Sequence, residues 1–152
     1  MIIKDQIIYA MGENKETAVR VPQNEPVTFH TRDCFNNQID GEEYVMDGLD
    51  WDHINPATGP VWVEGARAGD VLKVEILDNE GTMCCLPGDG VLGRDILRSS
   101  VKKVPVRDGF CLFDRIKIPV NPMIGVIGVA PAGEPVPCGT PGSHGGNMDN
   151  TK

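Results

Sequence analysis

Hydrophobic positions along the chain occur in short runs, and turn-forming residues separate one run from the next. Runs of this kind cover residues 2–9, 27–31 and 61–63, and each has the length of a single β-strand. A further apolar run at residues 82–86 fits a buried strand. Long helices do not tolerate so many breaks, so the pattern favours strands.

Residues 71–78 carry the clearest strand pattern in the chain. Leu72, Val74 and Ile76 occupy alternate positions, so an extended backbone places them on one face. The lysine and the glutamate between them fall on the opposite face. A tight turn at residues 68–70 precedes this run, and we therefore predict a half-buried strand here.

Two later runs also predict strands. Residues 110–118 alternate, although an aspartate interrupts the apolar face. The apolar residues assigned to that face are Phe110, Leu112, Ile116 and Ile118. Residues 123–130 are apolar and contain two glycines, which predicts a fully buried strand with close backbone neighbours.

The remaining segments add little regular structure. Residues 33–60 show no sustained period and read as a long loop with at most one helical turn. Residues 95–100 are the only helix candidate. The sequence thus predicts a mainly β protein, a β-sandwich or jelly-roll-like fold with short or no helices, in which residues 1–152 form a single β-rich domain.

Composition agrees with this prediction and excludes several classes of function. The 152 residues include 18 Gly and 12 Pro, and the formal net charge is −8. Acidic residues are evenly spread and there is no basic stripe, so we expect no nucleic-acid partner. No apolar run approaches the roughly 20 residues that cross a bilayer, and the first residues lack a signal-peptide pattern. We expect no membrane partner and a cytoplasmic location.

Cysteine usage points to reduced thiols. The five residues are Cys34, Cys84, Cys85, Cys111 and Cys138. An odd count with an adjacent pair does not suit a disulfide framework, and no Cys-x-x-Cys pair suggests a zinc site. We expect mostly buried thiols that pack as small hydrophobes. A thiol amidase that uses Cys84, Cys85 or Cys138 is an alternative, but it needs a nearby base that the sequence does not show.

The most unusual stretch is residues 139–149, in which glycines lie on both sides of His144. Glycines remove side-chain bulk, so a ligand can approach the imidazole and the neighbouring N–H groups. His144 can bind a metal through one ring nitrogen, and Asp149 lies close enough in sequence to join it. The Gly145 and Gly146 N–H groups can donate to a developing oxyanion. The alternative is a glycine-rich surface turn with an exposed histidine.

A second candidate lies just after the predicted strand at residues 27–31. Asp33 follows the end of this strand, a common place for a catalytic carboxylate. The alternative for Asp33 is a turn or capping residue. His30 faces the opposite way on an extended chain and is expected to be a packed strand histidine. His53 is expected to be a solvated loop histidine.

Five segments together resemble the acetamidase/formamidase family of amidases. They contain Thr-Arg-Asp-Cys-Phe, Asn-Pro-Ala-Thr-Gly-Pro and its continuation, Ala-Gly-Asp-Val-Leu, an apolar Pro-Met-Ile-Gly-Val run and His-Gly-Gly-Asn-Met-Asp. Their positions are residues 31–35, 55–66, 68–72, 122–131 and 144–149. They occur in the family's order and cover nearly the whole chain. The Asn-Pro-Ala-Thr-Gly-Pro segment followed by His-Gly-Gly-Asn-Met-Asp is the specific combination.

The resemblance implies a cytosolic hydrolase that splits short amides, such as formamide or acetamide, into ammonia and a carboxylate. It also implies a β-sandwich-type architecture, bound metal and assembly into oligomers. On the matching positions it implicates Asp33, His144 and Asp149 as site residues, with Asn147 beside them.

From these positions we form a hypothesis of metal-assisted amide hydrolysis. His144, Asp33 and Asp149 are the predicted ligands of a divalent ion, and one of the two carboxylates is the general base. Mixed nitrogen and oxygen ligands favour zinc, whereas a neighbouring site with carboxylates alone favours calcium. Gly145 and Gly146 are the predicted oxyanion donors, and Asn147 completes the predicted catalytic set.

Members of the resembled family are about twice as long as this chain. The second half of the family pattern carries further acidic and histidine residues that we expect to complete the site. An alternative function is therefore a non-catalytic β-scaffold half that assembles with a complementary carboxy-terminal half or with itself as a homo-oligomer. This alternative predicts an exposed apolar patch.

Overall fold

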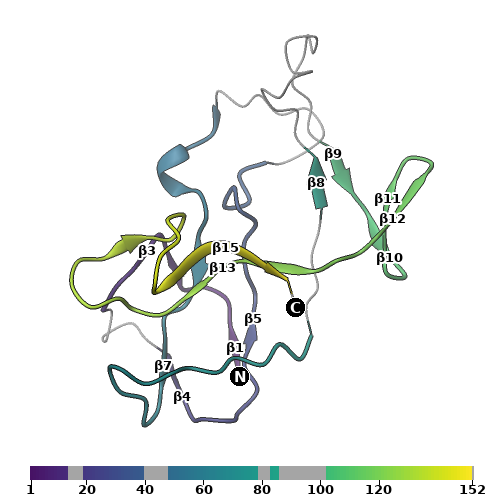
Figure 1. Cartoon of the computed structure of the whole chain (residues 1–152). Helices are drawn as coiled ribbons and strands as arrows, with labels where there is room; N and C mark the ends of the chain where they lie inside the picture. The colour runs from purple at the N-terminus through teal and green to yellow at the C-terminus, as the bar shows by residue number, and fades with distance from the viewer. Residues whose placement is uncertain (14–18, 40–47, 79–82, 86–101, 152) are drawn as a thin grey trace.

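The computed structural model describes residues 1–13, 19–39, 48–78, 83–85 and 102–151 (Figure 1). These residues form short strands and one 3₁₀ helix, η2 (Trp51–His53), so the mainly β class is confirmed. The strands are β1 (Ile2–Ile3), β2 (Ile7–Ile8), β3 (Ala10–Met11), β4 (Val19–Val21), β5 (Thr28–Phe29), β6 (Ala57–Thr58), β7 (Val61–Val63), β8 (Met83–Cys85), β9 (Lys102–Val104), β10 (Val106–Arg107), β11 (Phe110–Phe113), β12 (Ile116–Pro119), β13 (Met123–Gly128), β14 (Val136–Pro137) and β15 (Gly145–Thr151).

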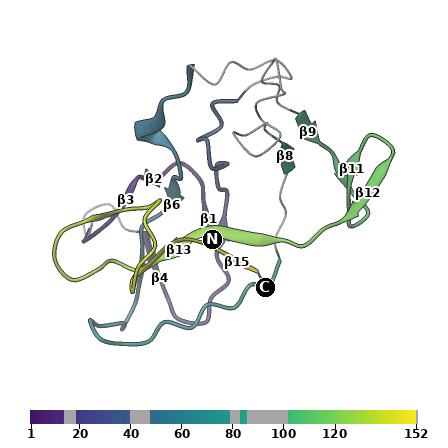
Figure 2. The same cartoon turned by 45° about the horizontal axis from the view of Figure 1, so that its top comes forward.

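The described strands pair in small sheets, many of which join distant parts of the chain. β1 pairs with β5 and β4 with β7 in parallel, whereas β2–β6, β3–β14, β8–β9 and β13–β15 are antiparallel. β10, β11 and β12 form a three-stranded meander that projects from one side (Figures 1 and 2). No helix among the described residues is long and apolar enough to cross a membrane.

The first predicted strand, residues 2–9, is divided in the structure. A bend at Asp5 separates β1 from β2. β1 runs parallel to β5, with Ile2 opposite Thr28, whereas β2 runs antiparallel to β6, with Ile7 opposite Thr58. The apolar run identifies residues that enter sheets, but two different partners divide it into two strands.

Residues 110–118 form a hairpin, so the prediction of a single strand is wrong. β11 and β12 run antiparallel, and Asp114 adopts a φ of 53° in the turn between them. Phe113 lies opposite Ile116, and residues that face each other across two strands share a face. Leu112 falls on the other face, so the predicted apolar face shared along this run is wrong as well.

Residues 71–78 do not form the predicted strand. The segment pairs with no strand of the described chain, and Val71 is 95% exposed. Alternation shows which residues suit a half-buried strand, but a strand also needs a neighbour that accepts its backbone hydrogen bonds. The segment therefore has the alternating side chains of a strand, but it pairs with no other strand among the described residues.

Three other predictions can be compared with the structure. β8 lies within residues 82–86, as predicted, and η2 is a helical turn in the described part of residues 33–60, where the sequence allowed for one. β13 lies within residues 123–130, but it is half-buried in its middle and exposed at both ends, so its predicted full burial is wrong. The helix candidate at residues 95–100 lies outside the described residues.

The buried core is small and lies where short strands meet. Its members among the described residues are Ile3, Met11, Val21, Ile39, Leu49, Val104, Cys111 and Cys138. Cys138 is fully buried, and its backbone N–H donates to the Tyr9 carbonyl oxygen at 2.8 Å. Its thiol donates to the Ile8 carbonyl oxygen at 3.6 Å. Cys138 thus joins the segment after β14 to β2 and β3.

We predict that two adjacent isoleucines of β1 differ sharply in their effect on stability. Ile3 is 3% exposed and Ile2 is 63% exposed. Ile3→Ala should lower the free energy of unfolding by about 2–4 kcal/mol, because it removes buried methyl groups and leaves a cavity. Ile2→Ala is the matched control and should change it by less than about 0.5 kcal/mol. Urea denaturation measures both, and equal losses would contradict this assignment of the core.

Candidate functional site

The glycine-flanked histidine lies at the tip of a tight turn that leads into β15. The Gly142 N–H donates to the Gly145 carbonyl oxygen at 2.8 Å, and the Gly145 N–H donates back at 3.0 Å. Ser143 and His144 are therefore the two residues of the tip. The Val129 N–H donates to the His144 carbonyl oxygen at 2.8 Å, which fastens this tip to the end of β13.

Glycine is required where this turn packs against its neighbours. Gly145 and Gly146 have φ values of 111° and 103°. A Cβ on Gly145 would overlap the Ile127 carbonyl oxygen, and a Cβ on Gly146 would overlap the Thr140 carbonyl oxygen. The two glycines thus let three backbone segments approach more closely than any side chain allows. Their predicted role as oxyanion donors stays a prediction, and the Gly145 N–H already donates within the turn.

His144 is half-buried, and one of its ring nitrogens is buried without a hydrogen-bond partner among the described residues. Its Nδ1 lies beside Gly142, where an added Cβ would be only 2.9 Å away. Its Nε2 is buried and has no hydrogen-bond partner among the described residues. Buried polar atoms are nearly always paired, and an unpaired one costs about 1–3 kcal/mol. A divalent cation or a substrate group would satisfy this nitrogen.

A β-bulge brings Asn147 and Asp149 together. The register of β13 and β15 shifts between Ile124 and Val126, and Asp149 adopts a φ of 48°. The side-chain oxygens of Asn147 and Asp149 lie 3.6 Å and 3.5 Å from the point that a Cβ on Gly125 would occupy. Bulges re-aim side chains, and this one lies where two side-chain oxygens approach the same glycine.

Asp33 organises its own turn, which is the capping alternative considered above. Its Oδ1 accepts hydrogen bonds from the Phe35 N–H at 3.0 Å and from the Asn37 N–H at 2.7 Å. The Asp33 N–H in turn donates to the side-chain oxygen of Asn37 at 3.0 Å. The residue is exposed. Its carboxylate therefore has a structural role in this conformation.

The three predicted metal ligands do not form a cluster in the structure. Within the described parts of the chain, no three His, Cys, Asp or Glu side chains lie close enough together to hold a metal ion. The side-chain oxygens of Asp149 and Asn147 both lie near Gly125, and His144 presents a single nitrogen. Any complete site therefore needs ligands beyond these contacts.

Asn55 connects the Asp33 turn to the histidine turn, and it was not among the predicted site residues. Its N–H donates to the Cys34 carbonyl oxygen at 2.7 Å. Its side-chain nitrogen lies 3.1 Å from the Cβ position of Gly139, in the segment that leads to the turn carrying His144. Asn55 has a φ of 50°, unusual for a residue before proline. The sequence signal that could have identified Asn55 is its position at the start of the Asn-Pro-Ala-Thr-Gly-Pro segment.

His53 is exposed, as expected for a solvated histidine, and it also forms a hydrogen-bonded pair with Asp50. Its Nδ1 lies 2.6 Å from Asp50 Oδ2, and its ring packs edge-on against Tyr9 at 4.7 Å between centroids. The hydrogen bond from His53 holds the pKa of the Asp50 carboxyl below its ordinary value.

Two other sequence expectations need correction or qualification. His30 is exposed and so is not a packed strand histidine, because β5 is exposed at both of its residues. Cys138 is fully buried, and this burial raises the pKa of its thiol, which opposes the thiolate that a nucleophile requires. The side chains of Cys84 and Cys85 lie outside the described residues.

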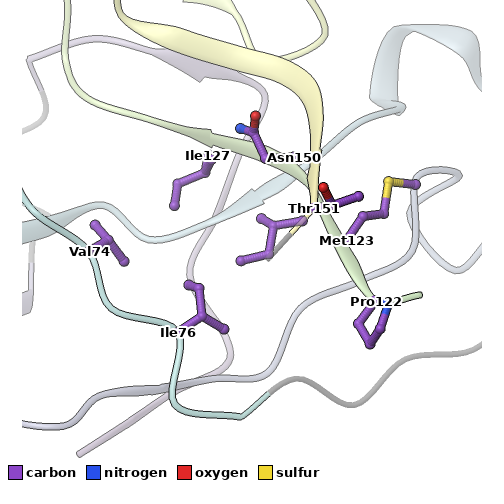
Figure 3. Close-up of a pocket in the computed structure, with 8 residues that line it drawn as sticks. Val74, Ile76, Pro122, Met123, Ile127, Asn150 and Thr151 are labelled. Atoms are coloured by element: carbon purple, nitrogen blue, oxygen red, sulfur yellow. The ribbon is translucent and has the colours of Figure 1, made fainter. Parts of the chain in front are cut away.

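The structure also contains an apolar hollow of about 150 Å³. It lies between residues 74–76 and the paired strands β13 and β15 (Figure 3). Its lining includes Val74, Ile76 and Ile127, and His144 is not part of it. The hollow is therefore separate from the polar groups that carry the candidate chemistry.

We predict that Gly146 is far less replaceable than another glycine with the same backbone angle. Gly133 has a φ of 98° and nothing within 4 Å of its Cβ position, so Gly133→Ala should cost about 1–2 kcal/mol for backbone strain alone. Gly146→Ala adds an overlap with the Thr140 backbone and should cost about 3 kcal/mol or more. Urea denaturation compares them, and equal costs would show that the close approach is not real.

We predict that His53 controls the titration of Asp50. In His53→Gln the pKa of Asp50 should rise toward its ordinary value, because its strongest hydrogen bond is weakened. A lowered folded-state pKa stabilises the fold above the unfolded-state pKa, and this contribution disappears as the pH falls through the folded-state pKa. Carboxyl ¹³C shifts followed against pH measure the effect, and an Asp50 titration that is identical in both proteins would exclude it.

The sequence and the fold both match known amidases. Residues 12–136 match the profile of the Acetamidase/Formamidase family. A predicted acetamidase/formamidase from Thermoanaerobacter tengcongensis is 42% identical, with a TM-score of 0.82 over 97% of this chain and 51% of that chain. Acetamidase from Bacillus halodurans is 36% identical, with a TM-score of 0.78 over 98% of this chain and 52% of that chain. No curated protein sequence matches.

Acetamidase from Yersinia enterocolitica shares the fold at 22% identity, with a TM-score of 0.76 over 98% of this chain and 52% of its own. This chain thus spans about half the length of each of these structures. The family profile ends before His144, but the structural matches extend over nearly the whole chain and so include the histidine turn. This chain belongs to the acetamidase/formamidase family.

Proposed function

We propose that this chain contributes to a cytoplasmic, metal-dependent hydrolase that converts short-chain amides of the formamide and acetamide type into ammonia and a carboxylate. The family supports amide hydrolysis in general. The observation that carries the proposal is the buried, unpartnered Nε2 of His144 on a turn walled by glycines. A ligand atom that pairs with this nitrogen must reach it past the close-packed backbone of residues 127–128 and 140–141.

The donor atoms suit a divalent cation. The neutral imidazole of His144 is a common zinc ligand, whereas the paired oxygens of Asn147 and Asp149 are of the kind that calcium prefers. Asp33 is the third predicted ligand. A divalent ion in this position would polarise the amide carbonyl and lower the pKa of water.

The remaining steps belong to the protein's own groups. Both hydrogen bonds that the structure describes to the Asp33 carboxylate end on Oδ1, so we assign its Oδ2 to accept the proton of the attacking water. Asn147 would orient the amide through its side chain. Backbone N–H groups at Gly145 and Gly146 would stabilise the oxyanion, which for Gly145 requires its bond to Gly142 to open.

The proposed active form is an assembly. A catalytic zinc site normally has three protein ligands, and the described residues bring no three His, Cys, Asp or Glu side chains together. The chain covers about half of its solved relatives. A complementary carboxy-terminal portion, or a second copy of the chain in a homo-oligomer, would therefore supply the missing ligands. Without it, the chain would be the non-catalytic β-scaffold half.

We predict metal-dependent ammonia release that depends on His144. The assay follows ammonia from formamide and acetamide with added zinc or calcium and with a chelator control. His144→Ala should lower both activity and metal affinity by about 100-fold or more, because even the outer-shell partners of a metal are worth about 10–100-fold. Zinc or calcium affinity measured by calorimetry gives a readout that does not require turnover.

His30→Ala is the matched control, since His30 is an exposed histidine remote in sequence from the turn. It should retain both activity and metal affinity. If His144→Ala also retains both, the site assignment is wrong. If the wild-type chain binds metal through His144 but releases no ammonia, this chain is the scaffold half, and catalysis requires its complement.

A further inference from the structure

One apolar surface of the chain has no function in the site described above. We define the open strand surface as residues 71–77 together with the hollow that Val74 and Ile76 share with β13. Val71 is 95% exposed, Val74 is 52% exposed and Leu77 is 68% exposed. Figure 3 shows Val74 and Ile76 turned toward Ile127 across this hollow.

The backbone of this surface, residues 71–77, pairs with no strand of the described residues. Apolar residues occur on both faces of the segment, with Leu72, Val74 and Ile76 on one and Val71 and Leu77 on the other. An extended segment with both features is a template for β-augmentation.

The solved relatives indicate what covers the surface. About half of each relative, 48–49% of its length, lies outside the region that this chain matches. The 42% identical relative shares the fold over 97% of this chain, and its remaining half belongs to the same polypeptide as that fold. An apolar strand edge is the part of a β fold that most needs such a neighbour.

We propose that the open strand surface binds an extended, apolar β-segment from the half of the family fold that this chain does not span. The segment pairs with the backbone of residues 71–77 and places alternate side chains in the hollow beside Ile127. Occupation by a second copy of this chain is the competing arrangement. The proposal does not depend on the chemistry of His144.

The test compares hydrogen exchange of residues 71–77 in two proteins. One is the 152-residue chain alone. The other is the same chain fused to the part of the Thermoanaerobacter tengcongensis relative that lies outside the match. Amides of residues 71–77 should exchange about 100-fold more slowly in the fusion, because a paired strand must open before it exchanges. In the chain alone, exchange of residues 71–77 should not depend on protein concentration.

Val74→Asp tests the side-chain part of the proposal, and Ile116→Asp is its matched control. Both residues are about half exposed, at 52% and 59%, and Ile116 lies on the projecting meander away from the surface. In the fusion, Val74→Asp should abolish the protection of residues 71–77, whereas Ile116→Asp should leave it intact. In the chain alone, exchange of this segment should be fast in all variants.

Three results would overturn the proposal. Equal exchange rates in the chain and the fusion would show that no segment pairs there. Concentration-dependent protection in the chain alone, with a dimer in light scattering, would assign the surface to a second copy. If the fusion does not fold, exchange is measured in the intact relative, and fast exchange in its segment aligned with residues 71–77 would also exclude the pairing.

Discussion

The close approach of three backbone segments around β15 is the constraint on which the candidate site depends. Gly128, Gly145 and Gly146 each lie where a Cβ would overlap a neighbouring carbonyl oxygen. Because no side chain separates them, the end of β13 and the Thr140 segment pack directly against the turn. The His144 ring is thereby held half-buried, with Nε2 lacking a partner. The geometry of the site therefore depends on glycine at these positions as much as on the side chains of the site residues.

The strand content was predictable, but the pairing was not. Short apolar runs with frequent turns identify a mainly β chain, and residues 123–130 and 82–86 contain strands as expected. Alternation at residues 71–78 describes side chains only, and it cannot say whether a partner strand exists. At residues 110–118 the signal that decides the structure is Asp114, whose left-handed φ turns one run into a hairpin.

The candidate site was predictable where its residues lie close together in the sequence. His144, Asn147 and Asp149 fall within six residues, and the structure brings the last two together over Gly125. Asp33 was predicted as a catalytic or metal residue, but its hydrogen bonds depend on the turn that follows it. Asn55 was missed because its importance comes from contacts with segments 21 and 84 residues away in the chain, which no local pattern records.

The bulge opposite Gly125 makes the count of residues in β15 as important as their identity. Side chains alternate between the faces of a strand, so a shift of one position exchanges the two faces. Substitutions at Met148, which is exposed, leave this count unchanged. Deleting Met148 would remove the bulge and turn the Asp149 carboxylate away from Gly125. The length of this strand is therefore as constrained as its two glycines.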